Sequence, residues 1–258
     1  MTLNEQSRSL RNERPRTPAG NTATSWLKVI ALVFMIIDHC GAVLLPRVPE
    51  MRIIGRIAFP IYAWCLIVGF HYTRSVPRYM LRILAVGLIS QPLYALAMNH
   101  PLTKPNIFLT LLLGLGALWG IREKRWGSHI WAPVLAVCLA TLLGADYGWK
   151  AIVFFMLLYA VQDSRSGIAA VMVAFFLFWG TSYSVTRSLF GIPVTLSALP
   201  KFLSEPLSAF LRLETYGLLS LPFLLIPIRK DLKIPKGAGY LLYPAHLVLI
   251  LILKAVFL

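Results

Sequence analysis

Long apolar runs follow one another along almost the whole chain, separated by short polar or basic connections. Most of them have about 15 to 20 residues, which is enough or nearly enough to cross the hydrocarbon core of a bilayer. The predicted fold class is therefore an all-α, polytopic integral membrane helical bundle. We expect about nine transmembrane helices (8–10), at residues 26–45, 53–70, 79–98, 106–121, 130–145, 149–162, 167–184, 215–228 and 239–257.

Two segments depart from this pattern. Residues 1–25 are polar and rich in arginine and proline, which predicts a disordered basic tail in front of one membrane domain at residues 26–258. The first apolar run lies far from the start and has no small-residue cleavage site, so it is expected to be a retained span. Residues 185–214 are less apolar and interrupted by proline, which predicts an interfacial or re-entrant segment that ends near Glu214.

Composition supports a membrane protein, since 58% of the residues are hydrophobic and only 14% are charged. The net charge of +15 suggests a nucleic-acid partner at first sight. With the N-terminus in the cytoplasm, however, 16 of the 25 Lys and Arg residues fall in cytoplasmic segments. This is the positive-inside bias of membrane proteins. It predicts a multi-pass membrane protein with a cytoplasmic N-terminus, in contact with lipids and without nucleic acid.

The candidate chemistry begins with Asp38 and His39, which lie inside the first apolar run. Ionisable residues at membrane depth are costly and usually functional. Neighbours on a helix point about 100° apart and do not meet. Each residue therefore needs a partner from another helix, and a purely structural pair that joins helices is the alternative.

His246, Tyr243 and Arg56 are the expected partners. His246 and Tyr243 share a face of the last span beside Pro244, although a lone histidine on an apolar helix is often only a core residue. The always charged guanidinium of Arg56 needs an anion near membrane depth, which Asp38, a substrate carbonyl or a phosphate can supply. Snorkelling of Arg56 to the interface is the alternative.

Further candidates are polar groups at the ends of the predicted spans. Arg74, Arg78 and Arg82 recur every four residues at the predicted cytoplasmic mouth, which suits the phosphates of a nucleotide-like donor and also follows from the positive-inside bias alone. Asp146 lies in a glycine-flanked turn, where it makes either an Asx-turn or a contact to an amine. We assign substrate binding to Asp146, Tyr240, Asn106 and Gln91, and expect no metal site.

The order of these residues resembles the TraX family. The resemblance rests on Lys28, Met35 and Asp38-His39, on Gly55-Arg56 with Phe59-Pro60, on Ser90-Gln91-Pro92 and Asn106, and on Tyr240, Tyr243-Pro244 and His246. The namesake of this family acetylates the N-terminus of F-type pilin. The same layout is similar to the wider transmembrane acyltransferase superfamily, and it covers about residues 26–257.

The resemblance implies acetyl-CoA as the donor, and a pilin amine or an envelope glycan hydroxyl as the acceptor on the far side of the membrane. His39 or His246 would act as general base, and Asp38 would orient a histidine. Arg56 or Tyr243 would stabilise the oxyanion, and an acetyl-histidine route stays open. A proton-coupled transporter and a non-enzymatic assembly partner in pilus biogenesis or conjugation are the alternatives.

Overall fold

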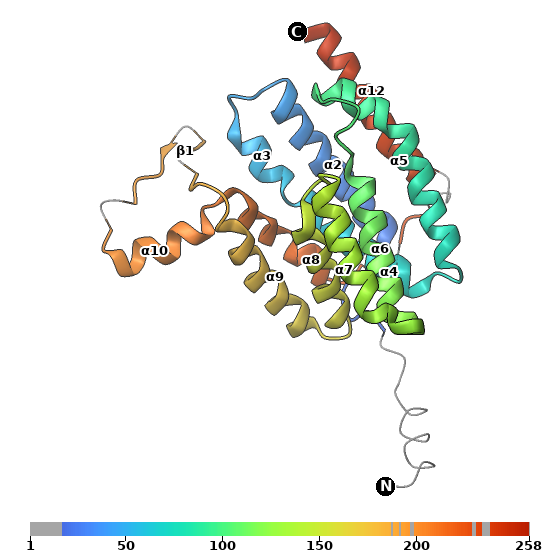
Figure 1. Ribbon diagram of the computed structural model, residues 1–258. Helices are drawn as coiled ribbons and strands as arrows, with labels where there is room; N and C mark the ends of the chain where they lie inside the picture. Colours follow the sequence, from blue (N-terminus) through green and yellow to red (C-terminus); the bar gives the residue numbers. More distant parts are fainter. Residues whose placement is uncertain are drawn as a thin grey trace.

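The computed structural model describes residues 17–186, 188–190, 192–196, 199–228, 231–233 and 238–257. Helices dominate these residues, and the strands form one short antiparallel hairpin (Figure 1). The elements, in chain order, are α2 (Thr24–Val43), α3 (Pro49–Gly55), α4 (Ala58–Tyr72), α5 (Val76–Met98), α6 (Ile107–Glu123), η1 (Arg125–Gly127), α7 (Ser128–Leu142), α8 (Gly148–Ala160), α9 (Arg165–Gly180), β1 (Ser188–Leu189), β2 (Ile192–Pro193), α10 (Lys201–Phe210), η2 (Leu213–Ser220), α11 (Leu221–Leu225) and α12 (Ala238–Phe257).

Four stretches of helix in the described residues are long and apolar enough to cross a membrane. They are α2, the α3–α4 pair, α5, and residues 239–257 of α12. The chain is therefore a membrane protein, as its composition predicts. The helices α8 and α9 and the η2–α11 pair are apolar but shorter. The count of about nine spans and the side of the N-terminus stay predictions.

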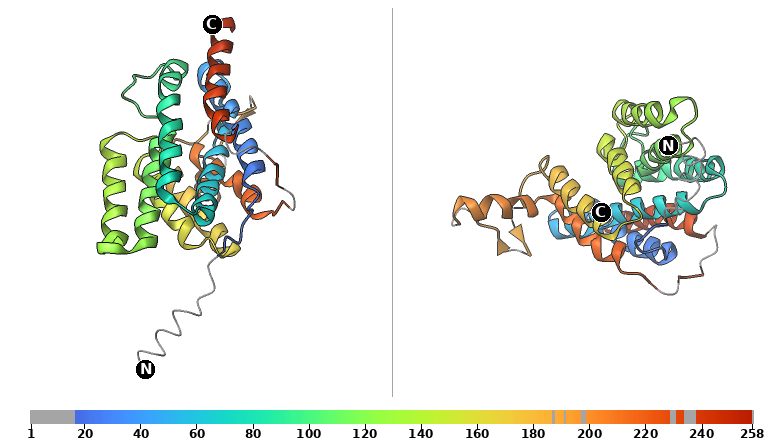
Figure 2. Two further views of the ribbon diagram at one scale, coloured as in Figure 1. Left: turned by 90° about the vertical axis from the view of Figure 1, so that its right-hand side faces the viewer. Right: turned by 90° about the horizontal axis from the view of Figure 1, so that it is seen from below.

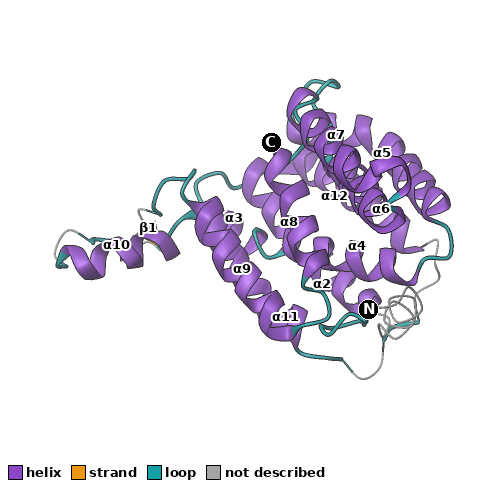
Figure 3. Cartoon of the chain, turned by 60° about the horizontal axis from the view of Figure 1, so that its bottom comes forward, coloured by secondary structure: helices purple, strands orange, loops and turns teal. Residues whose placement is uncertain are grey.

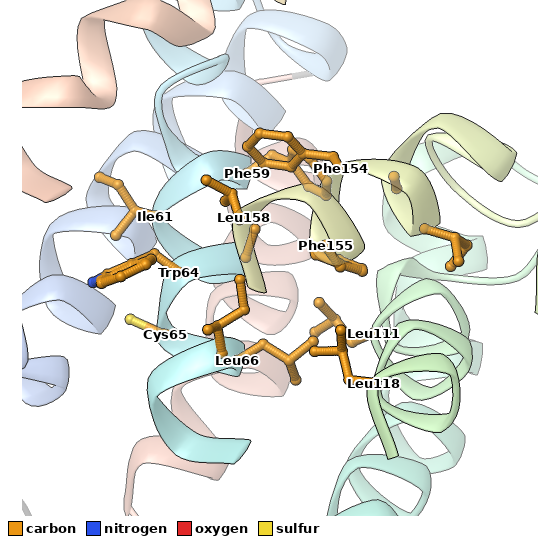
Figure 4. Close-up of a cluster of buried hydrophobic side chains, with 14 of the residues drawn as sticks. Phe59, Ile61, Trp64, Cys65, Leu66, Leu111, Leu118, Phe154, Phe155 and Leu158 are labelled. Carbon is orange, nitrogen blue, oxygen red and sulfur yellow. The ribbon is translucent and has the colours of Figure 1, made fainter. Parts of the chain in front are cut away.

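The helix α4 lies at the centre of the bundle, because it is apolar on every face and has no side that suits solvent. It packs against α2, α6, α8, α11 and η2. Figure 4 shows α4 and its neighbours closing around a core of large side chains. Those labelled there on α4 are Phe59, Ile61, Trp64, Cys65 and Leu66, and those from α6 and α8 are Leu111, Leu118, Phe154, Phe155 and Leu158.

The second predicted span is two helices rather than one. The α-helical hydrogen-bond pattern is interrupted at residues 56–57, where the N–H groups of Arg56 and Ile57 donate to the carbonyls of Ile53 and Ile54, three residues back. Pro60 is the physical reason, because it lacks the N–H that would bond the carbonyl of Arg56 and is best accommodated in the first turn of a helix, where it lies in α4. The break places Arg56 between two helix ends in the interior of the bundle.

The helix α12 lies at the edge of the bundle, where it packs against α5 and α2. Figure 2 shows α12 and α5 running alongside each other, with the C-terminal end of α12 reaching past the other helices. We call the end of the bundle where α2 begins and α4 ends the basic end, because Arg74, Arg78 and Arg82 lie there. The other end is the opposite end.

The predicted disordered tail is partly wrong. Residues 1–16 lie outside the described residues, but residues 19–23 pack against the bundle. Asn21 is buried, its N–H donates to the carbonyl of Leu224, and its own carbonyl accepts from the indole of Trp64 at 2.7 Å. Ordered structure therefore begins before residue 26.

The predicted interfacial segment contains the hairpin and α10. The hairpin pairs Ser188 with Pro193 and Leu189 with Ile192. Figure 3 shows the hairpin and α10 projecting sideways from the remaining helices. The chain then returns to the bundle through the 3-10 helix η2.

Candidate active site

A buried set of ion pairs joins three parts of the bundle. Asp38 of α2 accepts hydrogen bonds on both carboxylate oxygens, from Arg52 Nη1 at 2.5 Å and from Arg56 Nη2 at 2.6 Å. Arg56 also donates through Nη1 to Glu214 of η2 at 2.9 Å and to the hydroxyl of Tyr147 at 3.5 Å. Two acidic and two basic side chains thus balance each other formally inside the protein.

Because it is largely buried, this network is expected to contribute to the stability of the fold. The side chains of Arg56 and Glu214 are only 7% and 4% exposed. Removing one partner of such a buried pair leaves an uncompensated charge, which is strongly destabilising. We therefore expect the four residues to hold α2, α3 and η2 at fixed relative positions.

Gly55 makes the network possible. A Cβ at residue 55 would overlap the side chain of Asp38, so only glycine lets α3 approach α2 this closely. Together with the helix break after Gly55, this contact brings the guanidinium of Arg56 onto the carboxylate. In the Gly55-Arg56 pair, the glycine thus allows the close approach of α3 to α2, and the arginine forms the ion pair.

His39 faces a different partner. Its Nδ1 lies 3.1 Å from Nε2 of His246 on α12, and the two ring planes are inclined by 29°. Tyr243 packs edge-on against His246, with the ring centroids 4.7 Å apart. The expected contact between α2 and the last span is therefore present, while the chemical role of each histidine stays a prediction.

A cavity of about 170 Å³ reaches this histidine pair. His39 lines the cavity, whereas His246 is buried and is not among its lining residues. Residues of six helices line the cavity (α2, α3, α4, α5, α6 and α12), and hydroxyl-bearing rings are its most common polar groups. These rings belong to Tyr62, Tyr79, Tyr94, Tyr147, Tyr240 and Tyr243.

A second cavity of about 900 Å³ opens at the basic end. Its cationic lining residues are Lys28, Arg74, Arg78 and Arg82, so the predicted basic stripe does face one space. The two cavities adjoin, because they share the lining residues Lys28, Tyr79, Gly239, Tyr240 and Leu242. Lys28 and His39 are 11 residues apart on α2, which corresponds to about 16 Å along the helix axis.

Asp146 also lines the inner cavity. It lies in the turn between α7 and α8, and its carboxylate forms no ion pair within the described residues. Burial raises the pKa of this carboxyl above its ordinary value, and the positive charges of Arg56 and Lys104 oppose that change. The residue thus stays a candidate for contact with a substrate.

Two predicted substrate-binding residues make structural hydrogen bonds. Gln91 donates to the carbonyls of Leu102 and Lys104 and accepts from the N–H of Asn106. Asn106 caps α6 by accepting from the N–H of Phe108 at 3.0 Å, and it donates to the carbonyl of Gly87. Neither side chain lines the two cavities, and the contact of both residues with a substrate stays a prediction.

Two predicted roles also change. Asp38 was expected to orient a histidine, but both of its oxygens are taken by Arg52 and Arg56. Arg56 was expected to stabilise an oxyanion, but its guanidinium is held by Asp38, Glu214 and Tyr147 away from the free space. Asp38 still lines the inner cavity, whereas Arg56 does not.

Sequence reasoning missed several residues of the site. Arg52 precedes Arg56 by four positions, which places both on one helical face and is a usable signal. Glu214 was interpreted as the boundary of a segment, although an acid beside an apolar run is itself a sign of function or pairing. Lys28 was assigned only to topology and to the family pattern, and nothing in the sequence indicates that it faces two cavities.

The sequence of the chain is similar to those of several known proteins. The family model described as TraX protein matches residues 23–254. The chain is 27% identical over 186 residues to Probable fimbrial assembly protein FimC, serogroup H1, of Dichelobacter nodosus, covering 66% of this chain and 74% of that protein. It is 29% identical over 149 residues to Protein TraX of Escherichia coli, covering 55% of this chain and 59% of that protein.

An uncharacterised protein of Rickettsia prowazekii, RP591, is 27% identical over 148 residues, with 55% of this chain and 57% of that protein covered. The matches to RP591 and to Protein TraX thus span less than two thirds of each relative. No solved structure matches the chain.

Proposed function

The chain belongs to the TraX family, and on that premise we propose that it is a membrane-embedded acetyltransferase. It moves an acetyl group from cytoplasmic acetyl-CoA, bound at the basic end, to an acceptor that enters from the other side of the membrane. The proposed acceptor is an amine, such as the N-terminus of a pilin subunit, or a hydroxyl of an envelope glycan. The proposed location is the bacterial inner membrane, with the basic end in the cytoplasm.

The observation that carries this proposal is the pair of adjoining cavities between the cationic mouth and His39. The phosphates of CoA suit the wide outer cavity, where Lys28, Arg74, Arg78 and Arg82 supply cations. The narrow inner cavity suits the pantetheine arm. That arm has about the backbone length of four amino-acid residues, roughly 14 Å when extended, which is close to the distance from Lys28 to His39 along α2.

His39 is the proposed general base, because it lines the cavity and His246 does not. When Nδ1–H of His39 donates to Nε2 of His246, Nε2 of His39 is left without a proton and can accept one. Residue 246 then orients the ring of the base, which is the task of the acid in a catalytic triad.

In the proposed reaction, the acceptor nitrogen or oxygen attacks the thioester carbonyl carbon while the carbon–sulfur bond breaks. Nε2 of His39 takes the proton from the attacking group and returns it to the departing CoA sulfur. The hydroxyl of Tyr243, which also lines the cavity, is the candidate donor to the oxyanion. The tyrosine-rich wall keeps the thioester away from bulk water.

The proposal is tested by acetyl-CoA binding to the purified protein in detergent and by release of CoA on addition of an acceptor. Arg78→Ala combined with Arg82→Ala should weaken binding about a hundredfold or more, since each of the two lost charge-assisted bonds is worth about 1.5–3 kcal/mol. Arg125→Ala is the matched control, because Arg125 is an exposed cation of the η1 turn that lines neither cavity.

Two results would contradict the proposal. Proton flux in proteoliposomes without release of CoA would favour the proton-coupled transporter. Binding of a pilin subunit without acetyl-CoA binding, turnover or flux would favour a non-enzymatic assembly partner.

A further inference from the structure

Asp146 enters the lining of the inner cavity from the opposite end of the bundle. The helix α5 begins at the basic end, so the loop after it and the first turn of α6 lie at the opposite end. Thr110, in that first turn, donates its hydroxyl to the backbone carbonyl of Asp146 at 2.5 Å. Lys28 lines the same cavity from near the start of α2, at the basic end. The cavity thus takes a cation from one end of the bundle and an acid from the other.

The turn that carries Asp146 is held by close contacts. Gly144, Tyr147 and Gly148 have φ angles of 60°, 62° and 58°, in the left-handed region. This region is unfavourable for a residue with a bulky side chain such as Tyr147, and such residues gather at functional sites. The ring of Tyr147 stacks on Phe59 with the centroids 4.3 Å apart. The neighbour of Asp146 is therefore fixed against the core, which also fixes the position of the acid.

No cation among the described residues forms an ion pair with Asp146. The charged, titratable or polar groups that act on its carboxylate are Arg56, Lys104, Asp38, the N–H of Tyr147, and the hydroxyls of Tyr94, Tyr147, Tyr183 and Tyr243. Of the two cations, Arg56 is bound by other acids, and Lys104 is exposed. The start of α8, which follows Asp146, has no side-chain cap. The carboxylate is therefore available to a cation that enters the cavity.

The proposed reaction leaves one proton without an acceptor when the attacking group is an amine. An α-amino group has an ordinary pKa of about 7.7–8.0, so it arrives mostly as an ammonium ion at neutral pH. Its nitrogen loses one proton before the lone pair can attack the thioester, and a second proton afterwards. His39 takes the second proton and returns it to the sulfur, so the first proton needs another base. A neutral hydroxyl gives up only one proton and needs no such base.

We propose that Asp146 binds the ammonium group of the acceptor and takes its first proton. An N–H bond of the ammonium breaks, an O–H bond forms on the carboxylate, and the neutral amine attacks the thioester carbon beside His39, which lines the same cavity. The carboxyl releases its proton to water at the opposite end when the product leaves. The rings of Phe59 and Tyr147, also in the lining, attract a cation through their π faces. The proton step rests on the proposed acetyl transfer, whereas the ammonium site is tested without it.

The ammonium site is tested by calorimetric titration of the full chain in detergent, without acetyl-CoA, at about pH 6.5, where the probe is charged. The probe is trialanine amide with a free N-terminus. Asp146→Asn should weaken binding about tenfold or more, because a charge-assisted hydrogen bond is lost. Glu205→Gln is the matched control, since this exposed acid of α10 lines neither cavity. Equal affinity of the wild type and Asp146→Asn for the probe, or no binding by the wild type, would overturn the proposal.

The proton step is tested by the pH dependence of CoA release. At about pH 6.5 only about one amine in twenty-five is neutral, so Asp146→Asn should lower kcat/KM for trialanine amide about tenfold or more. The loss should shrink to about threefold or less at about pH 8.5, where most of the amine is neutral. With methyl N-acetylglucosaminide, a hydroxyl acceptor, the variant should match the wild type.

A loss of equal size at both pH values and with both acceptors would overturn the proton step, because a residue that only supports the fold behaves in this way. No release of CoA by the wild type with either acceptor would refute the acetyl transfer and, with it, the proton step. The calorimetric result decides on the ammonium site by itself, so the two failures are distinguishable.

Discussion

Replacement of Arg56 by glutamine should destabilise the protein more than any other single change in the ion-pair network. Arg56 is the cation that Asp38 and Glu214 share, at 2.6 Å and 2.9 Å. Arg52 still pairs with Asp38 in this variant. Within the described residues, Glu214 has no other ion-pair partner, and its carboxylate would be left buried without a cation.

The size of the effect follows from burial. Breaking a buried pair by removing one partner costs about 3–5 kcal/mol. At about 2–4 °C per kcal/mol for a chain of this size, Tm should fall by roughly 6–20 °C. Arg52→Gln is the matched control, because its side chain is 34% exposed and Asp38 keeps Arg56. A pair of that exposure is worth about 0–1 kcal/mol, so Tm should change by less than about 4 °C.

The assay is the loss of monodisperse protein on heating in detergent, followed by size-exclusion chromatography. Adding Glu214→Gln to Arg56→Gln should recover part of the lost stability, because the uncompensated charge is then absent. An unchanged Tm in Arg56→Gln together with a complete loss of acetyl transfer would refute the reasoning. Arg56 would then act on the substrate and not on the fold.

Three further predictions concern the cavities and the contact between α2 and α3. His39→Ala should lower the rate of transfer about 10²–10⁴-fold with acetyl-CoA binding retained. His246→Ala should lower the rate less, and His246→Gln should recover part of that loss because its amide can still bond the ring of His39. Equal losses in both alanine variants, with no recovery in His246→Gln, would exclude a positioning role for His246. Lys28→Met should weaken acetyl-CoA binding about tenfold in isothermal titration, while Lys124→Met, an exposed cation outside both cavities, should not. Gly55→Ala should lower stability by about 1–3 kcal/mol through overpacking against Asp38, and a wild-type Tm would contradict the close approach of the two helices.

The sequence predicts the helices well because apolar length is a local property. All nine predicted ranges overlap helical residues of the structure. The break at residues 56–57 was missed although Pro60 indicates it, because the apolar composition continues through the break. The first and last spans lie close to their predicted bounds, since nothing interrupts their apolar pattern strongly.

The sequence predicted the site only at residues whose ionisable side chain is costly to bury within an apolar helix. Asp38, His39 and His246 stand out because each is ionisable within an apolar run, and the structure brings each of them to a partner on another element. Gln91 and Asn106 satisfy backbone groups in and after α5, which explains their polarity without a substrate. A sequence does not distinguish a polar residue that binds a substrate from one that caps a helix.

The adjacency of Asp38 and His39 gains a physical explanation from their two sets of partners. The carboxylate points to α3 and, through Arg56, to η2, while the imidazole points to α12. The helix α12 lies at the edge of the bundle against α2 and α5, so the depth and rotation of α2 determine whether His39 meets His246. We expect the ion pairs of Asp38 with Arg52 and Arg56 to hold α2 at this depth and rotation, so that the acid positions the histidine through the helix backbone.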